Sequence, residues 1–351
     1  MASTLHDIAK EVGVSVATVS RVLNGRDNDR ISAATHLRVR EAATKLGYHP
    51  NRFARALVTG RTHFVALWVP YLWYPFAPEV MDSIQRQLDA TDYEMIVKGT
   101  EGDSARQIEA MSRLTRQVDG IIVVDRPDLL SGLIDRSSRR PAAVSAGTYV
   151  RDAVDTVEVD LSHGMAVGVR HLIEQDCSRI LYLVPTHAHN DTEARLIAYR
   201  RTVEDAGLEP WVVPFGGGSR RTARDAVARM AEWPRRPDAI CCHNDAAALG
   251  ALRALGDLGL RVPDDIALIG CDGVEDTEYT DPRISTVVQP IEEMCRTAWG
   301  FLRNRIEDPD IEHQSVTLEA PFVVRASSAR AARVGAADRD DEEVTTCVDH
   351  V

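Results

Sequence analysis

Between residues 62 and about 325 the chain repeats one pattern, in which short apolar segments alternate with longer amphipathic ones. The apolar segments have the length of buried strands, and the amphipathic segments have the period of helices that pack on a sheet. Such alternation is typical of parallel sheets covered by helices on both faces. Because one modest sheet cannot use so many elements, we predict two α/β lobes. The expected strands are 64–69, 94–97, 120–124, 142–145, 180–184, 211–213, 239–242, 266–270 and 321–324, and the expected helices include 76–90, 104–117, 163–175, 192–206, 220–232 and 245–258.

The first 48 residues follow a different pattern, that of three short helices. Thr4 and Asp7 can form a capping box at the start of the first helix, and Gly13 can end it. Ser15 can cap a second helix over residues 16–23, and Ser32 can cap a third that ends near Gly47. The break of three residues between the first two helices has the turn length of a helix-turn-helix motif.

In that motif the second helix enters the major groove of DNA. Here Val19, Val22 and Leu23 are expected to pack inward. Short hydrogen-bonding or methyl-bearing side chains followed by an arginine suit a groove better than a solvated face. The outward positions are Val16, Ala17, Thr18, Ser20, Arg21 and Asn24.

The charge is unevenly distributed along the chain. The net charge is 41 − 53 = −12, but residues 1–62 hold ten Lys/Arg and five Asp/Glu, a balance of +5. The remainder therefore carries 31 − 48 = −17. A small basic head on a large acidic body indicates that only the head meets a polyanion.

Two segments flank the α/β region. Residues 51–60, which follow Pro50, have moderate helix propensity but are too short to be helical alone in water, so they should need a partner surface. The tail beyond Ser328 is rich in Ala, Asp and Glu without an apolar period, and we expect it to be disordered. The predicted organisation is 1–50 for the head, 51–61 for a connecting helix, 62–328 for the two lobes and 329–351 for the tail.

The chain shows no secretory signal or membrane span, and its six cysteines have no CxxC spacing. We therefore expect reduced thiols in a cytoplasmic protein, with Cys241 and Cys242 on opposite faces of one strand. No cofactor is expected, since Walker, GxGxxG, nucleophile-elbow and zinc-ligand patterns are missing from the sequence. His187 and His189 are expected to be solvated loop histidines, and Gly216–Ser219 to form a turn.

Several motifs resemble the LacI/GalR family of bacterial transcription repressors, in the same order and across residues 4–328. They are TLHDIAKEVGVSVATVSRVLNG, ISAAT, AATKLGYHPN, NRFARAL, HNDAAALGALRAL, GCDGVEDTEYTDPRISTVVQP and PFVVRASS. The resemblance implies a helix-turn-helix head, a hinge helix and a two-lobed core like that of type I periplasmic sugar-binding proteins. It also implies a homodimer or tetramer whose operator affinity is set by a small effector. Since the tail lacks the leucine heptads of family tetramers, we predict a dimer.

The resemblance also implies roles in DNA binding. Val16 and Ala17 lie at the positions that dominate base choice and can offer only apolar contact, for example to a thymine methyl, while Arg21 would bind guanine. Leu57 corresponds to the family's minor-groove leucine and Ala54 to its small neighbour. Residues near phosphates would be Thr4, Leu5, Ser15, Ser32, Tyr48 and Asn51. The loop at 25–30, GRDNDR, is longer than usual in the family and puts phosphate contacts from this loop in doubt.

Five residues are candidates for effector binding. Asn244 and Asp272 follow predicted strands at the end where α/β proteins bind ligands, as does Asp125. Arg195 and Phe76 match family positions that contact the ligand. These groups suit the hydroxyls of a sugar, polyol or nucleoside-like effector. Turn formation is the alternative role of Asn244 and Asp272.

One position argues against a simple hexose. Sugar-binding family members often carry an aspartate where this chain has Ala146–Gly147.

Two other classes of function share parts of this pattern. A solute-binding transport protein would share the two lobes, but it would carry a signal peptide and no basic head. An enzyme with a doubly wound fold has no positive support in the sequence. The sequence therefore favours an effector-controlled, DNA-binding repressor that is not an enzyme.

Overall fold

The computed structural model describes residues 3–23, 31–48, 60–101, 104–115, 117–136, 142–150 and 154–330. The chain divides into two compact units. The first comprises residues up to His63 together with Gln117–Asp119, and the second comprises the rest. Four residues expected to contact DNA, Asn24, Asn51, Ala54 and Leu57, lie outside the described residues, as do most of the expected hinge helix and the tail from residue 331.

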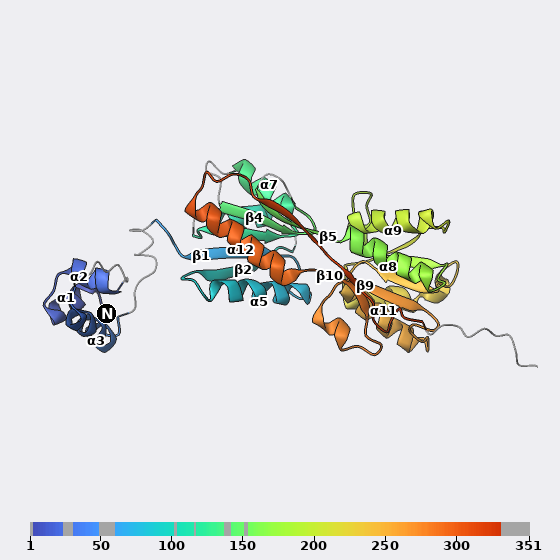
Figure 1. The fold of residues 1–351 in the computed structure, drawn as a ribbon, viewed down its shortest axis with the longest axis horizontal. Helices are drawn as coiled ribbons and strands as arrows, with labels where there is room; N and C mark the ends of the chain where they lie inside the picture. The colour runs from blue at the N-terminus through green and yellow to red at the C-terminus, as the bar shows by residue number, and fades with distance from the viewer. Residues whose placement is uncertain are drawn as a thin grey trace, which may run out of the picture. The chain divides into compact units, whose positions relative to one another are not determined.

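The first unit contains the three predicted helices, α1 (Leu5–Val12), α2 (Val16–Leu23) and α3 (Ala33–Lys45) (Figure 1). Thr4 and Asp7 form the predicted capping box of α1, and Gly13 ends that helix at φ 72°, a left-handed conformation that favours glycine. The Ser15 hydroxyl accepts a hydrogen bond from the Thr18 N–H at 3.1 Å, and Ser32 caps α3 in the same way.

A small apolar core holds the three helices together. Ile8, Val19 and Val39, one from each helix, are 0% exposed, and alanines of α1 and α3 fill the space between them. On the surface Lys45 lies 2.7 Å from Glu11 and joins the ends of α3 and α1. The helices therefore form one cluster, in which the predicted inward face of α2 is buried.

The end of the linker is fixed by Asp119. One carboxylate oxygen of Asp119 accepts hydrogen bonds from the N–H and hydroxyl of Thr62 at 2.7 and 2.8 Å, and the other accepts the N–H of His63 at 3.0 Å. His63 has φ 58°, an uncommon conformation for a residue with a side chain. These three hydrogen bonds hold the chain in that conformation directly before the first strand.

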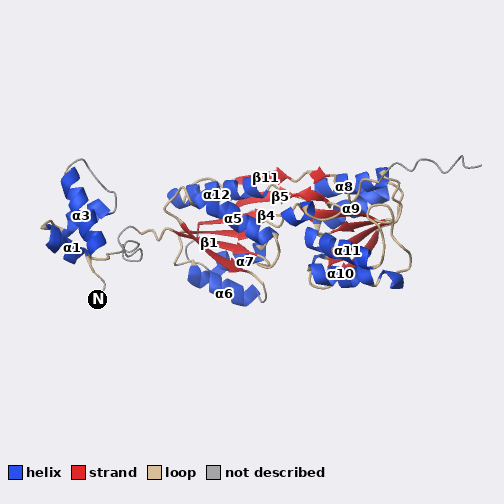
Figure 2. Cartoon of the chain, turned by 90° about the horizontal axis from the view of Figure 1, so that it is seen from below, coloured by secondary structure: helices blue, strands red, loops and turns tan. Residues whose placement is uncertain are grey.

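The second unit consists of two lobes, each built on a six-stranded sheet (Figure 2). The sheet of lobe 1 has the order β11-β5-β4-β3-β1-β2 and is parallel throughout. The sheet of lobe 2 has the order β12-β10-β9-β8-β6-β7, in which only β12 is antiparallel to its neighbour. The strands of lobe 1 are β1 (Phe64–Val69), β2 (Glu94–Gly99), β3 (Gly120–Val124), β4 (Ala142–Gly147), β5 (Asp155–Asp160) and β11 (Ser315–Glu319), and those of lobe 2 are β6 (Ile180–Pro185), β7 (Trp211–Phe215), β8 (Ala239–Cys242), β9 (Ala267–Asp272), β10 (Ser285–Val288) and β12 (Phe322–Val323).

Helices cover both faces of each sheet, as expected for parallel strands that are apolar on both sides. In lobe 1 these are α5 (Phe76–Leu88) and α12 (Ile291–Glu307) on one face and α6 (Ser104–Leu114) and α7 (Pro127–Arg136) on the other. In lobe 2 they are α8 (Ser162–Glu174) and α9 (Ala194–Asp205) on one face and α10 (Arg220–Ala228) and α11 (Asp245–Asp257) on the other. The predicted opposite orientation of Cys241 and Cys242 is confirmed, because the two thiols belong to different apolar clusters.

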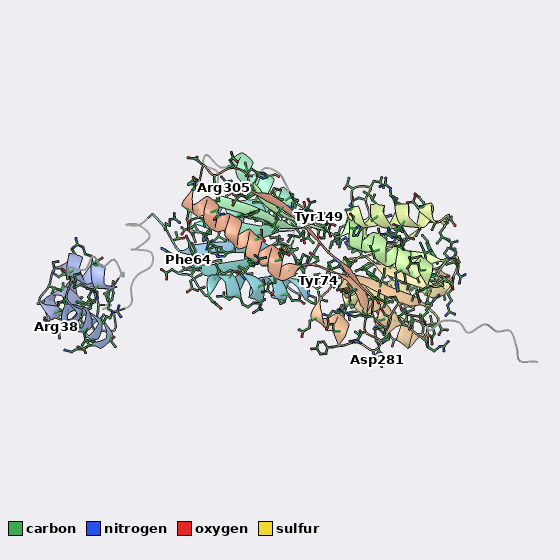
Figure 3. All side chains as sticks on the ribbon, viewed as in Figure 1. Arg38, Phe64, Tyr74, Tyr149, Asp281 and Arg305 are labelled. Carbon is green, nitrogen blue, oxygen red and sulfur yellow. The ribbon has the colours of Figure 1, made fainter. Side chains whose placement is uncertain are left out.

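The chain crosses between the lobes three times. It passes to lobe 2 between β5 and α8, returns to lobe 1 between β10 and α12, and crosses again between β11 and β12. Arg305 of α12 (labelled in Figure 3) forms an ion pair at 2.8 Å with Asp155 at the start of β5. The side chain of Asp155 is 1% exposed. This pair anchors the returning helix within lobe 1.

All nine predicted strands are present, but three others were not predicted. These are β5, β10 and β11, of which β11 alternates half-buried and exposed residues and β10 has only four residues. Helices α7 and α12 were also not named from the sequence. The expected disorder of the tail from residue 329 is wrong at its start, because the N–H of Arg330 donates to Gln175 at 3.1 Å and its guanidinium donates to the backbone of lobe 2.

Among the described residues, no helix combines the length and the apolar composition needed to cross a bilayer. The same part of the chain contains no group of three or more His, Cys, Asp or Glu residues able to hold a metal ion.

Candidate functional site

The exposed face of α2 carries the residues expected to meet bases. Val16 is 38% exposed, and Ala17 and Arg21 are also exposed. Thr18 and Ser20 are half-buried. Of the three residues predicted to point inward, Val19 and Val22 are buried and Leu23 is half-buried against the core of the head, so the amphipathic division of α2 holds.

Three of the expected phosphate-contacting residues cap helices. Thr4, Ser15 and Ser32 lie at the N-termini of α1, α2 and α3 and accept hydrogen bonds from backbone N–H groups there. A helix N-terminus attracts anions because of its unpaired N–H groups and its dipole. Leu5 and Tyr48 are half-buried against the core of the head. The structure thus gives Thr4, Ser15 and Ser32 a location suited to phosphate.

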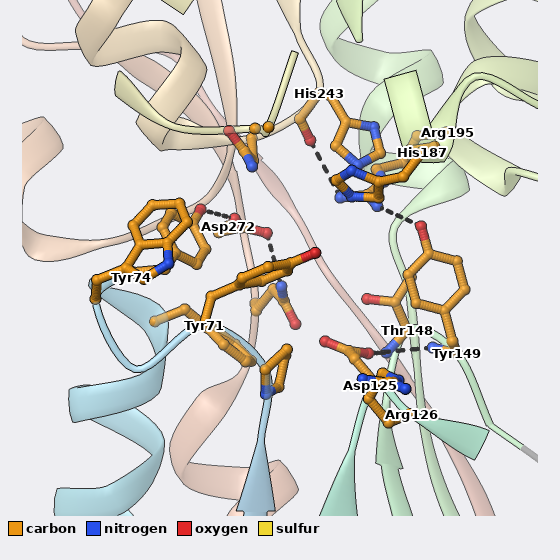
Figure 4. A pocket seen from close by; sticks show the side chains of 18 of the residues that line it. Tyr71, Tyr74, Asp125, Arg126, Thr148, Tyr149, His187, Arg195, His243 and Asp272 are labelled. Atoms are coloured by element: carbon orange, nitrogen blue, oxygen red, sulfur yellow. Dashed lines mark hydrogen bonds between the residues drawn. The ribbon is translucent and has the colours of Figure 1, made fainter. Parts of the chain in front are cut away.

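A cavity of about 260 Å³ lies between the two lobes (Figure 4). All five residues expected to bind an effector line this cavity. The full lining consists of Pro70, Tyr71, Trp73, Tyr74, Phe76, Asp125, Arg126, Thr148, Tyr149, His187, Ala188, Asn190, Arg195, Gly217, Gly218, His243, Asn244, Asp272 and Gln289. Most of these residues follow strand ends, which parallel topology brings to one edge of each sheet.

Arg195, in the first turn of α9, is 5% exposed and bound on three sides. Its Nε donates to Glu193 Oε1 at 2.8 Å, its Nη1 to the His243 carbonyl at 3.1 Å, and its Nη2 to the Tyr149 hydroxyl at 2.9 Å. Glu193 is 1% exposed, and its second oxygen caps α9 by accepting the Leu196 N–H at 2.7 Å. Arg195 therefore enters the cavity as half of a buried ion pair, with its positive charge balanced.

Asp272 ends β9 with φ 122°, a conformation that is strained for a residue with a side chain. Its Oδ1 accepts a hydrogen bond from Gln289 Nε2 at 2.8 Å, and its Oδ2 accepts one from the Tyr74 hydroxyl. Burial raises the pKa of this carboxyl. Behind it, burial and the charge of Asp272 raise the pKa of Asp245, which accepts the N–H groups of Gly273 and Val274 at 2.6 and 2.9 Å.

Asp125 follows β3, and its carboxylate lies at the cavity wall. Its Oδ1 accepts the N–H groups of Thr148 and Tyr149 at 2.6 and 3.2 Å. A Cβ atom on Gly147 would lie 2.3 Å from this oxygen, and Gly147 has φ 107°. The carboxylate of Asp125 thus occupies space beside β4 in which a side chain at position 147 would clash, which accounts for the glycine there.

Asn244 lies at the start of a helix and not in the turn considered as its alternative role. Its Oδ1 caps α11 by accepting the Ala247 N–H at 2.8 Å, while the residue also lines the cavity. Phe76, the first residue of α5, is 3% exposed and forms part of the apolar core as well as the cavity wall.

Sequence reasoning missed an aromatic group at the cavity. Tyr71, Trp73 and Tyr74 lie in the loop after β1, with ring centroids 5.5 Å apart for Tyr71 and Trp73 and 6.2 Å apart for Trp73 and Tyr74. The signal was present, because only 5% of the chain is aromatic and the segment YLWYPF follows a predicted strand. Tyr149, Glu193 and Gln289 were also missed, and nothing in their local sequence distinguishes them.

The two loop features at the other side of the cavity were expected to have no role. His187 is exposed as predicted, but it also lines the cavity, with its ring centroid 6.2 Å from that of Tyr71. Gly217 and Gly218 form the predicted turn, with φ of 74° and 71°, and bring backbone to the cavity.

Comparisons with known proteins agree with this architecture. The family described as "Bacterial regulatory proteins, lacI family" matches residues 4–51, and the "Periplasmic binding protein-like domain" matches residues 169–328. The HTH-type transcriptional repressor PurR of Aliivibrio fischeri (strain MJ11) is 30% identical over 333 residues, which cover 93% of this chain and 98% of that protein.

The chain belongs to the lacI family of bacterial regulatory proteins. It is a LacI-family transcriptional repressor with a helix-turn-helix head and a core of the periplasmic-binding-protein type.

Solved structures show the same fold. The Lac repressor dimer bound to operator and the anti-inducer ONPF superimposes with a TM-score of 0.82 at 23% identity, covering 94% of this chain and all of that one. A LacI-family regulator from Silicibacter pomeroyi gives 0.77 at 26% identity over 93% of this chain and all of that one. The transcriptional regulator CelR in complex with cellobiose gives 0.66 at 29% identity, covering 93% and 99% of the two chains.

Proposed function

We propose that this LacI-family repressor binds a palindromic operator as a homodimer and that a small, neutral, polyhydroxylated effector in the cavity between the lobes controls that binding. The observation that carries the proposal is that five residues spread over 272 − 76 = 196 positions of the chain all line one cavity. They are Phe76, Asp125, Arg195, Asn244 and Asp272. The CelR–cellobiose complex, at 29% identity, supports a carbohydrate-like ligand for a core of this kind.

The charges at the cavity favour a neutral ligand over an anion. Arg195 is paired with Glu193, and Arg126 is paired with Asp128, its Nε lying 2.9 Å from Oδ1. The carboxylates of Asp125 and Asp272 face the cavity without such a partner cation among the described contacts. A phosphate or carboxylate on the ligand would be repelled, whereas hydroxyls could donate to these carboxylates.

The head supplies the contact with DNA. Arg21 would bind guanine, and Val16 and Ala17 would contact bases by apolar surface, with Thr18 and Ser20 beside them. Thr4, Ser15 and Ser32 would bind phosphates at three helix N-termini. The proposed wedge by Leu57 and the contacts of Asn24, Asn51 and Ala54 complete this interface in the cytoplasm, where the DNA lies.

Operator binding is tested by a titration of a palindromic DNA fragment against salt. With a charge of +5 on each head, a dimer should neutralise on the order of ten phosphates, so log affinity should fall with log salt at a slope of roughly −9. A slope near zero would contradict operator binding through the head.

Effector binding is tested by a thermal-shift screen of the full chain against neutral sugars, polyols, nucleosides and their phosphorylated counterparts. A neutral compound should raise the melting temperature and change operator affinity, and Asp125→Ala or Asp272→Ala should abolish both effects. Asp191→Ala removes an exposed carboxylate outside the cavity and serves as the matched control. Selective stabilisation by a phosphorylated compound would refute the assignment of a neutral ligand.

A further inference from the structure

Two tyrosine hydroxyls cross from lobe 1 to charged side chains of lobe 2. Tyr74, in the loop after β1, donates its hydroxyl hydrogen to Asp272 at the end of β9. Tyr149, just after β4, accepts a hydrogen bond from Arg195 Nη2 at 2.9 Å and donates to Glu193 Oε1 at 3.2 Å. Dashed lines in Figure 4 mark the hydrogen bond of Tyr74 with Asp272 and that of Arg195 with Tyr149.

Asp272 and Arg195, the lobe 2 partners of these tyrosines, also form hydrogen bonds within lobe 2 through their other polar atoms. Asp272 Oδ1 accepts from Gln289, so the oxygen that Tyr74 uses is Oδ2. Arg195 commits Nε to Glu193 and Nη1 to the carbonyl of His243, so the nitrogen that Tyr149 uses is Nη2. A ligand in the cavity that binds Asp272 Oδ2 and Arg195 Nη2 therefore approaches the two atoms that the tyrosine hydroxyls already contact.

We propose that Tyr74 and Tyr149 are interlobe latches, whose hydroxyls hold the lobes together through Asp272 and Arg195 and are displaced from those atoms by hydroxyls of the effector. This inference rests on the proposed function for the identity of the site. An effector hydroxyl can replace each tyrosine hydroxyl, because an alcohol, like a phenol, can donate a hydrogen bond to the carboxylate oxygen and accept one from the guanidinium.

The positions of the two tyrosines suit displacement. Tyr149 is 36% exposed and Tyr74 is half-buried, and both lie in segments that follow strands. By contrast, Tyr182 and Tyr199 are fully buried within lobe 2, where Tyr199 donates to the carbonyl of Ile180 at 2.7 Å. The crossing tyrosines are therefore more accessible than the core tyrosines of lobe 2, and Tyr74 also packs against the edge of the apolar core.

One backbone amide reports directly on separation of the lobes. The Glu275 N–H, in lobe 2, donates to Glu79 Oε1 of α5, in lobe 1, at 3.1 Å. The neighbouring Val274 N–H donates to Asp245 within lobe 2. When the lobes separate, the Glu275 amide loses its partner and the Val274 amide keeps its own, so hydrogen exchange at the two sites distinguishes opening from unfolding.

The experiment measures amide exchange in the full chain carrying Tyr74→Phe, Tyr149→Phe or both. The control is Tyr279→Phe, at a residue of lobe 2 that is 80% exposed and lies outside the cavity. A hydrogen bond to a charged group stabilises the closed arrangement of the lobes, so each lost hydroxyl should raise the fraction of molecules with open lobes roughly tenfold. The rate of hydrogen exchange at the Glu275 amide should rise by the same factor. Exchange at Val274 should stay unchanged in every variant, and Tyr279→Phe should leave both amides as in the wild type. Equal exchange at Glu275 in wild type and double variant would overturn the latch.

Operator binding provides the second readout. If effector and latches compete, the double variant should mimic the effector and change operator affinity at least about fivefold without any ligand present. Wild-type protein that binds no operator would refute the proposed function while leaving the exchange result to decide the latch. A double variant with faster exchange at Glu275 but wild-type operator affinity would refute displacement as the control mechanism.

Discussion

Replacing Glu193 with alanine should be among the most destabilising single changes to the core. The substitution removes the carboxylate that pairs with Arg195 at 2.8 Å and leaves the guanidinium, 5% exposed, with only neutral partners. Breaking a buried ion pair in this way costs about 3–5 kcal/mol. Loss of the hydrogen bond to the Leu196 N–H removes the cap of α9 and contributes about 1 kcal/mol of that cost.

Urea unfolding of the full chain, followed by circular dichroism, measures this cost. Asp191→Ala is the matched control, because Asp191 pairs with Arg200 of α9 but its side chain is 94% exposed. Such an exposed ion pair contributes at most about 1 kcal/mol to the free energy of unfolding. The double substitution Glu193→Leu with Arg195→Met should cost less than the sum of the single changes, because it leaves no unpaired charge. If Glu193→Ala costs no more than Asp191→Ala, the buried pair does not stabilise the core as argued.

Three further outcomes follow from the structure. Because burial raises the pKa of Asp245 and Asp272, the folded chain keeps the protons of these carboxyls at pH values where the unfolded chain has lost them. The free energy of unfolding, measured in urea titrations, should therefore fall as the pH rises from about 4 past the raised pKa values, and Asp245→Asn should make this fall smaller. A rise in the free energy of unfolding over that pH range would contradict the argument. Ile8→Ala, at a position 0% exposed, should cost the head about 2–5 kcal/mol and melt it separately in calorimetry, while Leu37→Ala, 60% exposed, should not. Truncation after Arg330 should leave the number of subunits of the proposed dimer, measured by light scattering, unchanged, and a change in that number would assign assembly to the tail.

The strand and helix pattern of the lobes could be predicted where burial is complete. β3 and β6 are buried at every position and appear in the sequence as continuous apolar runs. β11 was missed because it is an edge strand, half-buried on alternate residues and exposed between them. β10 was missed because its four residues, STVV, begin with two hydroxyl side chains and form no continuous apolar run, unlike the four apolar residues of β8.

The cavity could be predicted only through strand ends and family positions. Asp125 and Asp272 follow apolar runs, so the sequence itself places them at the ligand edge of a parallel sheet. Glu193 and Gln289 have no such marker, since their roles arise from contacts with Arg195 and Asp272 that only the fold brings about. The aromatic residues of the loop after β1 are visible in the sequence, but their place at the cavity was not predicted, because a run of aromatic residues also fits an apolar core.

The three crossings between lobes bear on the synthesis of the protein. The helices of the head are contiguous and complete by residue 45, whereas lobe 1 lacks α12 and β11 until residue 319 has been made, and lobe 2 lacks β12 until residue 323. Domains of a nascent chain fold from the N-terminus as their segments emerge. A ribosome that stalls before residue 319 would therefore leave a finished DNA-binding head attached to two unfinished lobes. Such fragments would have the basic surface of the repressor without its core, and prompt degradation of them would protect operators from unregulated occupancy.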